Sequence, residues 1–216
     1  MVDKADRLFN EVKAGADDSA AHQLLKEFFA GYPIGNLRLL LDSKLDNAVK
    51  AGAWIASELG ENAAPLMPLV AERLNHPLKY VRFFMLDVVL VCAGPADRTA
   101  LTNAVGLMRD SEDAVRWKAM KFLVKATPQQ LTGSMSPEMD NELKQLTDWL
   151  VRMGGRYDKA VEIEEKLVSK SWLERAFAVV AAARHAPHDL TKLREAAQSA
   201  DREIQEFAEE QLRESK

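Results

Sequence analysis

The chain has 216 residues, and 47% of them are hydrophobic, which is enough apolar content for a folded core and excludes a disordered tail. Aromatic residues are few, with 10 Gly and 8 Pro in the whole chain, so the composition favours helices over a β-sandwich. The net charge of −4 excludes a general attraction to nucleic acid or to an anionic membrane, and leaves room only for a local basic patch. We therefore predict an all-α protein.

The polar N-terminus, the most apolar stretch and the single cysteine together indicate the compartment. The N-terminus is polar and acidic, whereas a secretory signal needs a basic start and an apolar core. The most apolar stretch, residues 83–94, is too short for a membrane span and contains Asp87. The single cysteine, Cys92, is expected to be a small buried side chain in a reducing compartment. We expect a cytoplasmic protein.

Apolar residues at helical spacing, interrupted by Gly and Pro, predict thirteen helices with short connections. The predicted helices cover residues 3–14, 18–30, 35–42, 45–59, 62–74, 78–93, 96–109, 112–126, 137–153, 157–169, 171–185, 189–199 and 201–214.

Glycine and proline positions predict where these helices end and begin. Gly60 and Gly94 are expected to close helices in the left-handed conformation. Pro77, Pro95 and Pro137 stand where a first helical turn tolerates a missing N–H. Residues 128–137 interrupt the helical pattern and are expected to form a connecting loop.

A short pattern recurs where the second helix of each predicted pair opens. It is centred on Val49, Val81, Val115, Leu173 and Ile204. The intervals are 32 residues (49 to 81), 34 (81 to 115) and 31 (173 to 204), and the longer gap from 115 to 173 accommodates one more degenerate unit near Leu143 or Leu146. A period in the low thirties indicates one helix pair per repeat.

Residues 64–82 and 108–116 each combine a helix end, a short turn and a Val-Arg helix start. In this they resemble HEAT repeats, and the resemblance covers about residues 34–214. It implies an α-solenoid of about six antiparallel helix pairs in a single domain, residues 1–216, with residues 1–30 as an N-terminal helical cap.

The same resemblance implies which polar residues are structural. Arg82, Asp110 and Arg116 are expected to tie one repeat to its neighbour. In the last two repeats Glu174 and Gln205 stand where an arginine is expected. Those repeats would then pack differently or form a polar terminal cap.

The sequence contains no phosphate-binding loop, dinucleotide fingerprint, zinc helix or cysteine pair. His185 and His188 are close enough to interest a metal, but Pro187 separates them, so helix-terminus histidines are the favoured interpretation. His76 precedes Pro77, where a capping role or solvent exposure is expected. We expect no catalytic residue, no cofactor and no metal.

A candidate contact surface lies on the second helices. If Val81, Met85 and Val89 face the core, the positions two and six residues after each repeat valine face the other side of the helix. Those positions carry an aromatic residue followed by a charge, and Trp54 is one residue short of the same register. The predicted partner-binding residues are therefore Trp54, Phe83, Asp87, Trp117 and Lys121. Core packing of Phe83 and Trp117 is the competing interpretation.

The favoured function is a non-catalytic protein-binding module, such as an adaptor, an assembly factor or an immunity-type inhibitor, with a protein or peptide partner. One alternative is a DNA-binding enzyme, since residues 171–176 resemble an element of HEAT-like alkylpurine DNA glycosylases, with Trp117 and Asp87 available to hold a cationic lesion. The acidic balance opposes binding to a phosphate backbone. A further alternative resembles HEAT-like chromophore lyases and would use Asp87.

Overall fold

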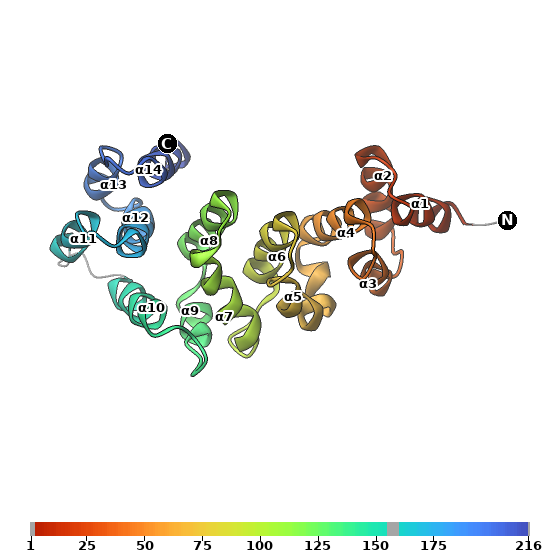
Figure 1. The fold of residues 1–216 in the computed structure, drawn as a ribbon, viewed down its shortest axis with the longest axis horizontal. Helices are drawn as coiled ribbons and strands as arrows, with labels where there is room; N and C mark the ends of the chain where they lie inside the picture. Colours follow the sequence, from red (N-terminus) through yellow and green to blue (C-terminus); the bar gives the residue numbers. More distant parts are fainter. Residues whose placement is uncertain (1–2, 155–159, 216) are drawn as a thin grey trace. The chain divides into compact units, whose positions relative to one another are not determined.

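The computed structural model describes residues 3–154 and 160–215, and the described residues form helices and turns without a strand. The chain divides into two compact units, residues 1–104 and 105–216. The elements of unit 1, shown in Figure 1, are α1 (Lys4–Lys13), α2 (Asp18–Phe29), η1 (Ile34–Asn36), α3 (Leu37–Leu41), α4 (Asp46–Glu58), η2 (Gly60–Leu66), α5 (Met67–Arg73) and α6 (Lys79–Cys92). α7 (Arg98–Gly106) spans the boundary between the units.

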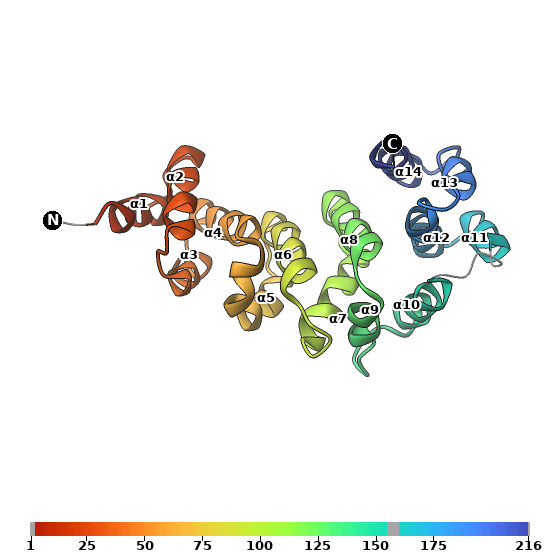
Figure 2. The same ribbon diagram turned by 180° about the vertical axis from the view of Figure 1, so that it is seen from behind.

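Unit 1 is built on the packing of α4 against α6, with α3 against α4 and η2 and α5 against α6. Figures 1 and 2 both show α4 and α6 in one row and α3 and α5 in another. Val81, Met85 and Val89 of α6 are fully buried, as the helical period predicts. Burial of each of these side chains stabilises the folded state by about 1.5–3 kcal/mol.

Gly52 sets the distance between α3 and α4. A Cβ atom at this position would lie 2.8 Å from the Cβ of Leu40, closer than two carbon atoms can approach without displacement. The absence of a side chain therefore allows the backbones of these two helices to pack in direct contact.

Unit 2 contains η3 (Leu107–Arg109), α8 (Asp113–Lys125), α9 (Pro128–Ser134), α10 (Asn141–Met153), α11 (Ala160–Leu167), α12 (Trp172–His185), α13 (Thr191–Ala196) and α14 (Arg202–Glu214). α12 is the centre of this unit: it packs against α8, α11, α13 and α14. The guanidinium of Arg184 on α12 donates to the carbonyl oxygens of Leu123, Val124 and Ala126 at 2.6, 3.0 and 2.8 Å. This side chain satisfies carbonyls that the C-terminus of α8 leaves without an intrahelical partner.

The degenerate repeat predicted near residue 143 is the pair α9 and α10. Leu143 and Leu146 are both buried on α10, which packs against α9 and α12. Since α8 packs directly against α12, the α9–α10 pair lies beside that contact and does not separate the two helices. Across the described residues the prediction of about six helix pairs is confirmed. The elements that pack together are α3 with α4, η2 and α5 with α6, η3 with α8, α9 with α10, α11 with α12, and α13 with α14.

The loop predicted at residues 128–137 is wrong for residues 128–134, which form helix α9. Thr127 caps the helix: its hydroxyl oxygen accepts from the N–H of Gln130 at 3.2 Å, and the side chain of Gln130 accepts from the N–H of Thr127 at 2.9 Å. This reciprocal capping box, with Pro128 at the first helical position, explains why a helix with little apolar periodicity forms here.

Other predicted boundaries also change. Gly60 has the expected positive φ, but Gly94 does not, because α6 ends at Cys92 and Ala93 continues as extended backbone. The helix predicted to begin at Pro137 begins at Asn141, where the Asp140 carboxylate accepts from a backbone N–H in the first turn. Residues 157–159 of the predicted helix 157–169 lie outside the described residues.

Among the described helices, none is long and apolar enough to cross a membrane. The predicted helices at residues 3–14 and 18–30 are confirmed as α1 and α2, which pack against each other. Their role as a cap, and the organisation of the chain as one domain, stay predictions.

Candidate functional site

A repeated turn precedes the second helix of five pairs. In each, a polar side chain accepts a hydrogen bond from the N–H two residues later, which is the local geometry of an Asx or Ser/Thr turn. The acceptors are Ser43, His76, Asp110, Ser169 and Ser199, at donor–acceptor distances of 2.9–3.2 Å. The helices α4, α6, α8, α12 and α14 all begin three residues after this acceptor. The turn residue therefore gives a structural register for the repeats.

An arginine six residues after the turn residue clamps three of these turns. Its Nη1 donates to the carbonyl oxygen of the turn residue itself: Arg82 to His76 at 2.7 Å, Arg116 to Asp110 at 2.9 Å and Arg175 to Ser169 at 2.8 Å. Arg82 and Arg116 thus clamp the backbone of their own turns. The expectation that Arg82, Asp110 and Arg116 tie one repeat to its neighbour stays a prediction.

The expectation that the repeat before α12 lacks this arginine is wrong. The recurring pattern, centred on Leu173 in this repeat, places Glu174 at the arginine position, but the register of the turn places Arg175 there. Arg175 also joins neighbouring repeats, because its Nη2 lies 2.6 Å from the Asp201 carboxylate in the turn before α14. In the last repeat Gln205 does occupy the arginine position, as predicted.

The same register relates the five predicted contact residues to one another. Phe83 and Trp117 each lie seven residues after their turn residue. Trp54, Asp87 and Lys121 each lie eleven residues after theirs. Trp54 is therefore in register, and the one-residue offset inferred from the valine pattern is wrong.

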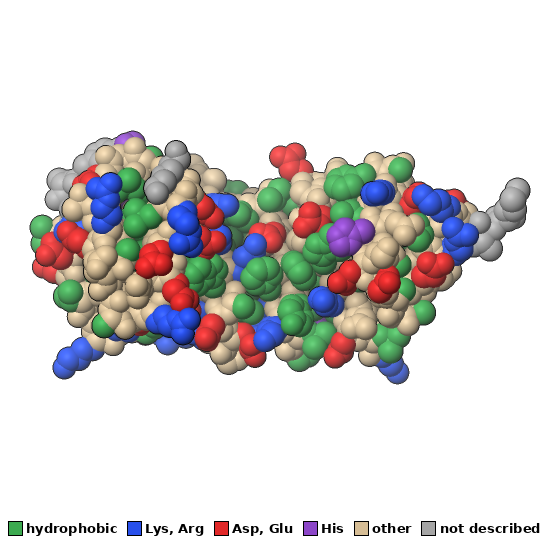
Figure 3. Space-filling view, turned by 90° about the horizontal axis from the view of Figure 1, so that it is seen from above, with side chains coloured by type: hydrophobic (Ala, Val, Ile, Leu, Met, Phe, Trp, Pro, Cys, Tyr) green, Lys and Arg blue, Asp and Glu red, His purple; other side chains and the backbone are tan. Residues whose placement is uncertain are grey.

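In unit 1, Trp54, Phe83 and Asp87 are all half-buried on the adjacent helices α4 and α6. The Trp54 ring packs on His22 of α2 with ring centroids 4.4 Å apart, and Phe83 meets the edge of Phe84 at 5.5 Å. These side chains are neither excluded from water like the core nor fully exposed. The face drawn in Figure 3 shows hydrophobic side chains interspersed with charges of both signs.

In unit 2, α14 covers Trp117 and Lys121. The Trp117 ring meets the edge of the buried Phe207 at a centroid distance of 5.3 Å. Lys121 Nζ lies 2.7 Å from Glu210 and 3.1 Å from Glu214. Burial lowers the pKa of Lys121, but its two carboxylate partners outweigh burial and raise it overall. Both side chains are therefore engaged within the protein.

Arg116 adds to the contact between α8 and α14. Its Nη2 lies 2.9 Å from the Glu203 carboxylate, and its guanidinium stacks on the Trp172 ring at 5.1 Å. The carboxylate partner, Glu203, raises the pKa of Arg116 against the opposing effect of burial. The clamp arginine thus also links two helices that are far apart in sequence.

The element at residues 171–176, which resembles part of the DNA glycosylases, is used structurally. Ser171 caps α12, and Arg175 clamps the turn. The Glu174 carboxylate accepts from Ser169 and from Lys166, and the Ser169 hydrogen bond is the main cause of its lowered pKa. These side chains contact other residues of unit 2.

Histidine and cysteine positions do not assemble a metal site among the described residues. The His185 and His188 rings lie 5.9 Å apart near the end of α12. His76 accepts from the N–H of Leu78, so its ring closes the turn before α6. The Cys92 thiol is half-buried and donates to the Gly60 carbonyl at 3.3 Å, and burial raises its pKa.

No family model matches the chain, and no curated protein is significantly similar to it. Among solved structures it is similar to a designed armadillo repeat protein, with 14% identity, a TM-score of 0.46, and coverage of 100% of this chain and 96% of that one. It is also similar to an engineered protein, with 15% identity, a TM-score of 0.44, and coverage of 86% and 99%. The chain is an all-helical repeat protein, as its own helix pairs and repeated turns show.

Proposed function

We propose that this protein is a non-catalytic, cytoplasmic protein-binding module whose contact surface in unit 1 comprises Trp54, Phe83 and Asp87. The observation that carries the proposal is that two large aromatic side chains stay partly accessible on adjacent second helices, while Ala53, Ile55 and Met85 beside them are fully buried.

The chemistry of these three side chains suits recognition of another protein. Large aromatic side chains that become fully desolvated at an interface supply much of its binding free energy. Asp87 occupies the repeat position of Trp54 on the neighbouring helix, so a carboxylate accompanies the two rings. The expected partner surface therefore offers an apolar pocket or groove to the two rings, with polar groups at its rim.

Trp117 and Lys121 occupy the equivalent positions of unit 2, but we leave them out of the proposed surface. Their side chains are engaged by Phe207, Glu210 and Glu214 of α14. A partner would have to displace these contacts before reaching them.

The net charge of −4 and the interspersed charges in Figure 3 favour a protein partner over nucleic acid. A protein that follows a phosphate backbone needs a stripe of Lys and Arg, and its affinity falls steeply with salt. The side chains of residues 171–176, the segment that resembles a glycosylase element, also have structural partners within unit 2.

The proposal is tested by affinity capture of tagged protein from nuclease-treated lysate of its native cells, followed by mass spectrometry. The wild type is compared with a Trp54→Ala, Phe83→Ala double variant. A matched control replaces Phe29 and Tyr80, two exposed aromatic residues of the same unit, by alanine. We expect one stoichiometric protein with the wild type and the control, and its loss with the double variant.

Two results would oppose the proposal. Capture that disappears after nuclease treatment would show that nucleic acid bridges the association. A captured protein retained equally by all three forms would place its contact surface elsewhere.

A further inference from the structure

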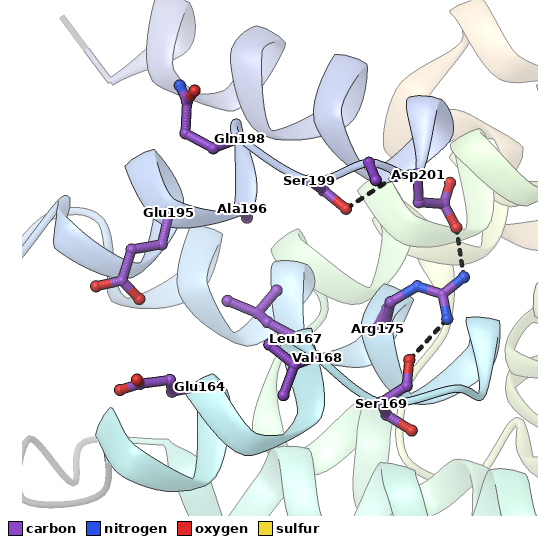
Figure 4. A pocket seen from close by; sticks show the side chains of 11 residues that line it. Glu164, Leu167, Val168, Ser169, Arg175, Glu195, Ala196, Gln198, Ser199 and Asp201 are labelled. Carbon is purple, nitrogen blue, oxygen red and sulfur yellow. Dashed lines mark hydrogen bonds and ion pairs between the residues drawn. The ribbon is translucent and has the colours of Figure 1, made fainter.

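Unit 2 contains a cavity of about 760 Å³ between α11, α13 and the turn before α14. Leu167 and Val168, at the end of α11, line its middle, and Ala196 and Ala200 contribute further apolar atoms. Figure 4 shows Leu167 and Val168 between Glu164 and Glu195 on one side and the pair Arg175–Asp201 on the other. We call this cavity the α11–α13 groove. Its volume is within the range of pockets that enclose drug-sized ligands.

The middle of the groove is apolar and open to water. The Val168 side chain is 81% exposed, although a single exposed valine on a protein surface is ordinary. What distinguishes Val168 is its place on the wall of a cavity, next to Leu167. A ligand that covered both side chains would gain from removing their apolar area from water.

The side chains that line the groove carry a net negative charge. Arg175 and Asp201 neutralise each other at 2.6 Å, and the remaining Arg175 donors hold the carbonyls of Ser169 and Lys170. Glu164 and Glu195 remain, with side chains 61% and 44% exposed.

One lysine already bridges the two glutamates. Lys192 Nζ lies 2.9 Å from Glu164 and 2.8 Å from Glu195, and this lysine side chain is only 13% exposed. Two carboxylates therefore share one ammonium group, which leaves a net negative charge at this mouth of the groove. The bridge also holds the carboxylates of α11 and α13 close together, so an incoming cation could pair with both.

We propose that the α11–α13 groove binds a segment of a partner protein in which an apolar residue stands next to an arginine or a lysine. The apolar side chain packs on Leu167 and Val168, and the cationic group pairs with Glu164 and Glu195. The exposed amide of Gln198, also on the groove wall, hydrogen-bonds the main chain of the segment. This second site rests on the proposal that the protein binds other proteins, but not on the unit 1 surface.

The test uses fluorescence anisotropy with three labelled octapeptides of alternating residues: leucine with arginine, leucine with glutamate, and serine with arginine. The leucine–arginine peptide is expected to bind at least tenfold more tightly than either of the others, because each of those lacks one of the two required features. Its affinity is expected to fall between 50 and 300 mM NaCl, since the carboxylates are partly exposed and screened.

Variants of the full chain then locate the binding. Glu164→Gln with Glu195→Gln is expected to weaken the leucine–arginine peptide at least tenfold. The matched control, Glu165→Gln with Glu206→Gln, removes the same charge from exposed sites outside the groove and is expected to change affinity less than twofold.

Val168→Lys provides a second test that does not disturb the lysine bridge. The added charge repels the cationic peptide from within the groove, so at least tenfold weakening is expected. Its control is Val161→Lys, an equally drastic change at an exposed valine on α11 that does not line the groove.

The proposal fails if wild-type protein does not bind the leucine–arginine peptide, if the leucine–glutamate peptide binds equally well, or if the groove variants and their controls behave alike. The Trp54→Ala, Phe83→Ala variant separates this site from the unit 1 surface: unchanged peptide binding by that variant supports an independent site. Loss of peptide binding in that variant would place the peptide on unit 1 and overturn the groove assignment.

Discussion

Replacing Arg175 by methionine tests whether the repeated turn and its arginine clamp stabilise unit 2. Methionine keeps the aliphatic part of the side chain but removes the guanidinium group. The change leaves the carbonyls of Ser169 and Lys170 without their donor and the carboxylate of Asp201 without its cation.

The expected cost follows from the burial of these groups. Both members of the Arg175–Asp201 pair have side chains about 20% exposed, so solvent screens the pair less than a surface pair. A lost partner for a largely buried polar group costs about 1–3 kcal/mol, and more for a charge. Discounting for the remaining exposure, we expect Arg175→Met to lower the unfolding free energy of unit 2 by about 2–3 kcal/mol.

Urea denaturation followed by tryptophan fluorescence measures this cost. Trp117, Trp149 and Trp172 all lie in unit 2, so a Trp54→Phe background confines the signal to that unit. The control is Arg152→Met, since Arg152 forms an exposed pair with Asp148 four residues earlier on α10, and such pairs contribute about 0.3–0.5 kcal/mol. Equal losses for the two variants would refute the clamp.

Three further results are expected, each measured by urea denaturation of the unit concerned. Gly52→Ala should destabilise unit 1 by about 1–3 kcal/mol, because the new Cβ atom would lie 2.8 Å from that of Leu40; no loss would show that α3 and α4 can separate freely. Trp117→Ala should cost unit 2 about 2–3 kcal/mol through lost packing on Phe207, whereas a change below 0.5 kcal/mol, the range of ordinary surface substitutions, would mean that α14 does not cover it. Burial lowers the pKa of His76 below its ordinary 6.5, so the folded state binds a proton at this residue less readily than the unfolded state. The stability that neutral His76 contributes is therefore present above about pH 6.5 and is lost as the pH falls towards the lowered pKa. His76→Ser keeps a turn acceptor without a titrating group, so it should weaken the loss of unit 1 stability between pH 7 and 5; identical pH profiles for variant and wild type would contradict this.

The helices and much of the core follow from local sequence. Val81, Met85 and Val89 recur at helical spacing and are buried on α6 as that spacing predicts. The capping box at Thr127 and Gln130 is also local, so the sequence itself carries a start signal for α9 that apolar periodicity alone does not show. The same holds for Arg175: the polar turn residue gives the register more reliably than the valine does, since the turn hydrogen bond holds the helix start in place.

The candidate sites depended on the tertiary structure more than the helices and the core did. Repeat spacing selected Trp54, Phe83 and Asp87 and also Trp117 and Lys121, because equivalent positions have the same local pattern. Only the fold shows that the last two are engaged by α14.

Long-range packing was beyond the sequence patterns. Lys121 and Glu210 are 89 residues apart, and α8 packs directly against α12 although α9, α10 and α11 intervene in the sequence. Helical period and caps depend on residues within a few positions of one another, so they determine which segments are helical and which faces are apolar. Which helix covers which face depends on complementary side chains brought together from distant segments, and the α11–α13 groove exists only where two such segments leave space between them.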